Sequence, residues 1–126
     1  WSSDGTRLVF TRDGVLQVIN ADGSGLTSLG NADAASSPDW SPDGARIAYG
    51  TSAGLRMRNA DGSNPAVVTS GHDDHPRWSP DNLRLVFSRL VDGKSQLYVV
   101  NADGSGERKL SVGSAQESTP SWSPVP

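Results

Sequence analysis

The stretch W-S-P-D-G-A-R-I-A-Y at residues 40–49 decides the fold, because it occurs three times in the chain. Its copies are W-S-S-D-G-T-R-L-V-F at 1–10 and W-S-P-D-N-L-R-L-V-F at 78–87. A second phrase follows each copy: N-A-D-G-S-G at 20–25, N-A-D-G-S-N at 59–64 and N-A-D-G-S-G at 101–106. Two phrases in a fixed order indicate a tandem repeat, with units at about 1–39, 40–77 and 78–121.

Each phrase contains a turn. In the first phrase Pro42 fixes φ, Asp43 can accept hydrogen bonds from nearby backbone amides, and Gly44 supplies a positive φ. In the third copy Asn82 stands in place of this glycine, and asparagine also tolerates a positive φ. An Asp-Gly pair between two apolar strands is the strongest short-range hairpin signal. The pairs are Asp22 with Gly23, Asp61 with Gly62, and Asp103 with Gly104.

The apolar residues between the turns predict short strands. Residues 8–10, 47–49 and 85–87 are apolar at consecutive positions, as in a strand covered on both faces. Three further strands per repeat are expected, the last leading into a tryptophan at 36–41, 75–79 and 119–123. Four antiparallel strands per repeat predict an all-β fold, a β-propeller with three blades. The repeat positions Trp1, Trp40, Trp78 and Trp122 mark the blades, and Trp1 and Trp122 are equivalent. We expect Trp40 and Trp78 to be substantially buried, together with the aromatic residues of the second strand, Phe10, Tyr49 and Phe87.

The two phrases together resemble the TolB-like propeller repeat, which also occurs in tricorn-type and prolyl-oligopeptidase-type propellers. The resemblance covers essentially the whole chain. It implies a partner-binding protein of the periplasm or the cell exterior, whereas the residues themselves leave the compartment open. Since propellers host binding proteins, scaffolds and enzymes alike, the resemblance says more about fold than about function.

Three blades do not close a ring, because propellers have typically about 4–8. The first repeat begins at Trp1 without a leading strand, and residues 115–126 contain a spare one. We therefore expect two copies to form six blades around a two-fold axis, the C-terminal strand of each completing the first blade of the other. Trp1 and Trp122 would then compete for one position. The alternative is a fragment excised from a longer propeller or designed, with no ligand.

Composition excludes several classes of function. The net charge is −3, whereas nucleic-acid-binding proteins typically have an excess of basic residues. No apolar stretch is long enough to cross a membrane as a helix. The chain has no cysteine, so it has neither a disulfide nor a thiolate. No nucleophile elbow, phosphate loop or dinucleotide fingerprint is present, and we expect neither an enzyme nor a cofactor.

The run His72, Asp73, Asp74 and His75 is the one concentration of metal-type ligands. His75 aligns with Ser37 and Thr119, which places it at the start of an inner strand near the central channel. The run is either a Zn²⁺ or Mn²⁺ site or a solvated polar loop. The first interpretation makes a metal-dependent hydrolase or lyase in the channel the alternative function.

Two other sequence patterns resemble binding sites. The N-A-D-G-S turns resemble the start of a calcium loop, but Asn31, Ser70 and Val112 stand where a bidentate Glu is required, which favours simple turns. Arg56 and Arg58 depart from the repeat and are either ligands for a partner's carboxylate or a solvated strand face. The leading hypothesis is a non-catalytic propeller module that self-assembles and binds a protein or peptide.

Overall fold

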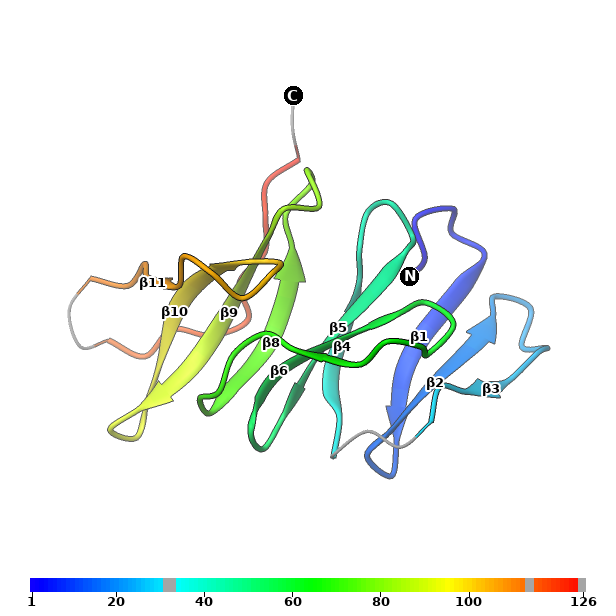
Figure 1. Cartoon of the computed structure of the whole chain (residues 1–126), viewed down its shortest axis with the longest axis horizontal. Coiled ribbons are helices and arrows are strands. Elements are labelled where there is room, and N and C mark those ends of the chain that lie inside the picture. The colour runs from blue at the N-terminus through cyan, green and yellow to red at the C-terminus, as the bar shows by residue number, and fades with distance from the viewer. Residues whose placement is uncertain (31–33, 113–114, 125–126) are drawn as a thin grey trace.

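Three antiparallel sheets stand side by side in chain order (Figure 1). The structure is a computed structural model, and it describes residues 1–30, 34–112 and 115–124. Each sheet is one blade, and blade numbers follow the chain. The strands are, in blade 1, β1 (Arg7–Arg12), β2 (Val15–Asn20) and β3 (Thr27–Ser28); in blade 2, β4 (Ser36–Trp40), β5 (Arg46–Thr51), β6 (Gly54–Asn59) and β7 (Ala66–Val67); in blade 3, β8 (Asp73–Trp78), β9 (Arg84–Val91), β10 (Lys94–Asn101) and β11 (Arg108–Lys109).

The strands of each blade pair in simple meander order, β4-β5-β6-β7 and β8-β9-β10-β11. The inner strands β4 and β8 end at the tryptophans, so they span the repeat boundaries at 39/40 and 77/78. The predicted turn follows each tryptophan: Gly44 has φ +74°, and Asn82 takes the same left-handed conformation at +62°. The replacement of glycine by asparagine in the third copy is thus explained by backbone geometry.

Two apolar cores lie between the blades. Blades 1 and 2 enclose Leu16, Ile47 and Tyr49, with Trp40 at the inner end. Blades 2 and 3 enclose a second set that contains Leu55, Leu85, Phe87, Trp78 and Val100. The burial predicted for Trp40, Trp78, Tyr49 and Phe87 is confirmed.

An arginine of each blade stacks on the tryptophan of the next inner strand. The guanidinium carbon of Arg7 lies 4.9 Å from the centre of the Trp40 ring, and that of Arg46 lies 4.5 Å from the Trp78 ring. These are cation–π contacts, and they tie blade to blade at the inner end. The arginine of the repeated phrase therefore has a structural role between blades.

The open end of the arc differs from the prediction. Blade 1 has three strands in the described part of the chain, and residues 119–123 form no ladder. Phe10 is only half-buried, so the burial expected for it is wrong, and Trp1 is 68% exposed. Among the described residues no sheet packs against the outer face of β1, whereas Tyr49 and Phe87 each face a preceding blade.

Among residues 1–30, 34–112 and 115–124, no helix has the length and apolarity needed to cross a membrane.

Candidate functional site

A groove runs along the inner ends of the blades, where β4, β8 and the C-terminal segment lie next to one another. It has a volume of about 410 Å³. Each of the three elements contributes the same portion of the repeat, from the residue before the tryptophan to the proline after it. The lining residues are Asp39, Trp40, Pro42, Arg77, Trp78, Pro80 and 121–124. In closed propellers the inner strands surround a central channel, and the groove lies along the inner strands of this chain.

The groove carries one acidic and one basic side chain at equivalent positions of neighbouring strands. Asp39 Oδ2 accepts a hydrogen bond from the Trp78 backbone N–H at 2.8 Å. Burial raises the pKa of the Asp39 carboxyl, although the Trp78 amide and the nearby Arg77 oppose that shift. Arg77 donates to the Pro76 carbonyl at 2.9 Å. A carboxylate beside a guanidinium on an apolar floor suits an extended peptide.

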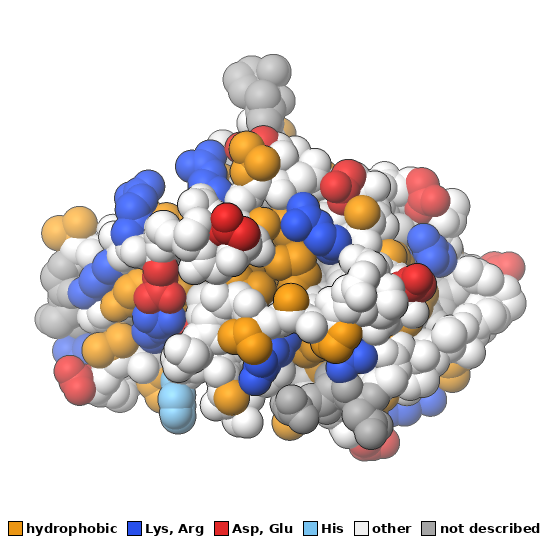
Figure 2. All heavy atoms as spheres, in the orientation of Figure 1, with side chains coloured by type: hydrophobic (Ala, Val, Ile, Leu, Met, Phe, Trp, Pro, Cys, Tyr) orange, Lys and Arg blue, Asp and Glu red, His pale blue; other side chains and the backbone are white. Residues whose placement is uncertain are grey.

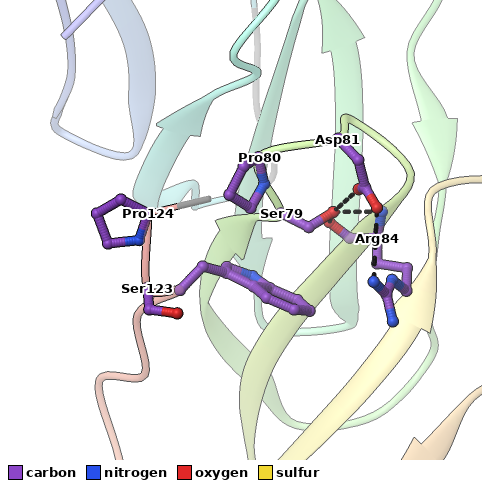
Figure 3. Close-up of a pocket in the computed structure, with 7 residues that line it drawn as sticks. Ser79, Pro80, Asp81, Arg84, Ser123 and Pro124 are labelled. Atoms are coloured by element: carbon purple, nitrogen blue, oxygen red, sulfur yellow. Dashed lines mark hydrogen bonds and ion pairs between the residues drawn. The ribbon is translucent and has the colours of Figure 1, made fainter. Parts of the chain in front are cut away.

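A smaller pocket lies where the C-terminal segment meets blade 3 (Figure 3). Ser123 and Pro124 face the turn that contains Ser79, Pro80 and Asp81. Trp122 lies against Arg84, with the guanidinium carbon 5.3 Å from the ring centre, and its Nε1–H donates to the Arg77 carbonyl at 2.9 Å. The C-terminal segment is thereby docked on the last blade.

The run from His72 to His75 is divided between different contacts. Asp73 is fully buried and turns away to Arg89, while Asp74 accepts hydrogen bonds from the Ser36 hydroxyl at 2.8 Å and the His75 amide at 2.7 Å. His75 Nδ1 lies 3.7 Å from Asp74 Oδ2. In the part of the chain that the structure describes, no three His, Asp or Glu side chains gather as a metal site. A metal at this run stays a prediction.

The two predicted partner arginines lie on the face of β6 that points to blade 1. Arg58 donates to the Tyr49 hydroxyl at 2.9 Å and to the Leu29 carbonyl at 2.8 Å, so its guanidinium bridges blades 2 and 1. Arg56 is partly buried, and its Nε has no hydrogen-bond partner among the described residues. A role of this pair in gripping a partner stays a prediction.

The Asp-Gly turns bind their own backbone. In each turn the aspartate accepts from the amide and the hydroxyl of the serine two residues later, as Asp22 does from Ser24 at 2.9 and 2.6 Å. These serine hydrogen bonds lower the pKa of Asp22, Asp61 and Asp103. Asn31, which the calcium pattern would use, lies outside the described residues. The geometry is that of an Asx turn, in agreement with the interpretation as simple turns.

The sequence analysis does not identify a buried ion pair within blade 3, between the neighbouring strands β8 and β9. Arg89 binds Asp73 through two nitrogens at 2.6 and 2.8 Å, and it reaches Glu107 at 2.5 and 3.0 Å. The Thr69 hydroxyl of the β7–β8 connection also donates to Asp73. Both carboxylates raise the pKa of Arg89, Asp73 most. The pair holds the loop entering blade 3 to the sheet.

Three repeated antiparallel sheets, two of them four-stranded in the described residues, and inner strands that end at tryptophan define a β-propeller segment. A family model described as the TolB beta propeller domain matches residues 1–126, and the chain belongs to that family. A Tol-Pal system protein TolB from Syntrophus aciditrophicus is 43% identical over 47 residues, which are 37% of this chain and 9% of that protein.

Solved structures show the same fold. TolB from Acinetobacter baumannii superposes with a TM-score of 0.75 at 20% identity, over 93% of this chain and 33% of that one. An oligogalacturonate lyase in complex with manganese has a TM-score of 0.57 at 19% identity, over 76% of this chain and 30% of that one. The chain thus spans a minor part of the length of the proteins it matches, and the low identities show the fold alone.

Proposed function

We propose that the chain is a non-catalytic propeller module that associates with a second copy and binds an extended peptide or protein segment at the channel mouth. The observation that carries the proposal is the alignment of three equivalent inner elements, with an open blade at one end and an unpaired strand at the other. The name of the curated relatives, a Tol-Pal system protein, refers to a system of several proteins, which supports a partner-binding role.

Self-association is favoured by the two ends of the arc. At blade 1 the outer face of β1 leaves Leu8 and Phe10 half-exposed, while their counterparts Ile47 and Phe87 are completely buried. An uncovered apolar sheet face beside an unpaired strand edge favours association. Two arcs of three blades make six, which lies in the range of about 4–8 found for closed propellers.

Light scattering across a concentration series tests this association. The chain mass is 13.2 kDa, and we expect a species of about twice that mass at micromolar concentration. A single species of one chain mass throughout the series would overturn self-association. Species that grow with concentration beyond two chains would mean that the contact forms without closing.

Partner binding is supported by the charges and the apolar floor of the groove. Asp39 and Arg77 line the groove, and Figure 2 shows acidic and basic side chains interspersed on the face in view. Asp39 and Arg77 lie on neighbouring strands of the groove. Asp39 can therefore bind a positively charged group of a peptide, and Arg77 can bind a negatively charged one.

Random peptides selected on the immobilised chain provide the test of the groove. We expect selected peptides to lose about tenfold or more in affinity for Arg77→Ala, because one charge-assisted hydrogen bond contributes about 1.5–3 kcal/mol. Arg108→Ala, on the exposed outer strand β11, is the matched control and should bind as the parent does. Selection of no peptide, or equal binding to Arg77→Ala, would contradict a peptide site at the groove.

A further inference from the structure

The C-terminal segment already has the conformation of an inner strand, although it pairs with no strand of the described chain. Thr119 has φ +52°, and the two residues aligned with it, Ser37 in β4 and His75 in β8, have +46° and +54°. In both inner strands this left-handed residue lies where the register shifts against the neighbouring strand. The bulge of an inner strand is therefore formed at Thr119 in the absence of a ladder.

Two further contacts place the segment where the next blade would begin. The Glu117 amide donates to the Ser95 carbonyl at 2.7 Å, as the Ala35 amide donates to the Gly14 carbonyl at 2.9 Å before β4. Trp122 stacks on Arg84 of blade 3 as Trp40 stacks on Arg7 of blade 1. Residues 115–124 thus occupy the same position on blade 3 that β4 and its approach occupy on blade 1.

The edge of β1 is the complementary half. Among the described residues β1 pairs with β2 alone, whereas its counterparts β5 and β9 each pair with an inner strand as well. The turn that joins an inner strand to β1 is also formed. The Ser2 amide donates to the Arg7 carbonyl at 2.8 Å, and the Arg7 amide donates to the Ser2 hydroxyl at 2.9 Å. The Ser41 turn of blade 2 has both bonds.

We infer that residues 118–122 of one copy add to β1 of a second copy as an antiparallel fourth strand in one defined register. The inference rests on the self-association proposed above and specifies its geometry. In blade 2, Trp40 lies opposite Ile47, Asp39 opposite Ala48 and Ser36 opposite Gly50. The same offsets put Trp122 opposite Leu8, Ser121 opposite Val9 and Ser118 opposite Thr11 of the other copy.

A second copy is the occupant that the chain itself specifies. Among the described residues one preformed inner strand has no ladder and the β1 edge has no inner strand, so two copies satisfy both needs by reciprocal exchange. The joint also covers Leu8 with the Trp122 side chain, since residues opposite each other in an antiparallel pair share a face. Strand addition therefore buries two surfaces together: the half-exposed outer face of β1, and the face of blade 3 that points away from blade 2.

The register has a consequence for the two equivalent tryptophans. Trp122 would enter the position that repeat alignment gives to Trp1 of the other copy. Trp1 is 68% exposed and Trp122 is half-buried and stacked, so Trp122 holds the site and Trp1 stays in solvent. Trp122→Ala should raise the dimer dissociation constant by about tenfold or more, as truncation of an interface tryptophan does. Trp1→Ala should leave it within about threefold, and an equal loss for both variants would contradict the displacement of Trp1.

Disulfide trapping tests the register, since the parent chain has no cysteine. A tagged Val9→Cys chain is mixed with an untagged Ser121→Cys chain, oxidised mildly and run on a non-reducing denaturing gel. Directly opposite residues have Cα atoms about 4.5–5.5 Å apart, which lies within the reach of a disulfide. We expect the mixed cross-link in the majority of chains, and each variant oxidised alone is the background control.

The shifted pair, Thr11→Cys with Ser121→Cys, serves as the matched control. Its positions are diagonal neighbours about 7–8 Å apart, so the yield should fall severalfold. An equal or higher yield for the shifted pair would overturn the register. No cross-link in a preparation that light scattering shows to be dimeric would overturn strand addition but leave self-association standing. A monomeric preparation would refute both.

Discussion

Replacing Arg89 by Met should destabilise the protein more than any exposed charge replacement. The Asp73 carboxylate is fully buried, and Arg89 satisfies it through two hydrogen bonds while its guanidinium lies 4.7 Å from the Tyr98 ring centre. Removing one partner of a buried ion pair costs about 3–5 kcal/mol, because the other charge remains without compensation. The Glu107 contact is partly exposed and adds at most about 1 kcal/mol.

The assay is urea unfolding at a fixed protein concentration, since dimerisation would make the midpoint depend on it. Thermal unfolding is the second readout: at about 4 °C per kcal/mol for a domain of this size, the melting temperature should fall by about 12–20 °C. The double variant Arg89→Met, Asp73→Leu should recover most of the loss, because no buried charge is left. Arg108→Ala is the exposed control and should change the unfolding free energy by less than about 0.5 kcal/mol. A loss below about 1 kcal/mol for Arg89→Met would refute the reasoning.

Four further outcomes are expected. Serine hydrogen bonds lower the pKa of the turn aspartates, to about 2 at Asp4. The stability that these carboxylates contribute above pH ~4 should therefore be lost in an acid titration as the pH falls toward 2. The aspartates concerned are Asp4, Asp22, Asp43, Asp61, Asp81 and Asp103. Asp39→Asn should raise the melting temperature at pH 7, because burial raises the pKa of the Asp39 carboxyl and so disfavours its charged form. The amide oxygen of the asparagine can still accept the hydrogen bond from the Trp78 N–H. The gain should vanish at acid pH, where Asp39 is protonated in the parent chain. Trp78→Ala should cost about 3–5 kcal/mol in unfolding free energy, and a melting temperature close to that of the parent would contradict its place in the core. Zn²⁺ or Mn²⁺ should not shift the melting temperature, whereas a rise that His75→Ala abolishes would revive the hydrolase or lyase hypothesis.

The blades could be predicted from sequence because their information is local and repeated. Pro42 with Gly44, and the Asp-Gly pairs, set φ at fixed offsets, and the apolar runs between them have strand length. The tryptophan spacing then gives the blade size. Even the exception at Asn82 follows from local backbone preference, and the structure bears it out at φ +62°.

The ion pair within blade 3 could not be predicted in the same way. Arg89 aligns with Arg12 and Thr51 in the other repeats, so no motif marks it as the partner of Asp73. Asp73 itself suggested a metal ligand because sequence shows the residue type without its orientation. Likewise Phe10 has the same motif as Tyr49 and Phe87, but among the described residues no sheet covers its face of β1, and it is half-exposed.

The groove and the docked C-terminal segment depend on placement in space. Asp39, Arg77 and Ser121 align in the repeat, but their different residue types hide the alignment until three inner elements are seen together. Alignment of the three repeats identifies Thr119 as the counterpart of Ser37 and His75. Their shared left-handed φ supplied the new information that the strand is preformed.

Small-angle X-ray scattering of the intact chain tests most directly whether two three-blade arcs close into one propeller. It reports the mass and the radius of gyration together. A closed particle of twice 126 residues should show a single compact species with a radius of gyration of about 18 Å. One chain mass with a radius near about 14 Å, or a dimer whose radius is well above that of a compact particle, would contradict closure by strand exchange.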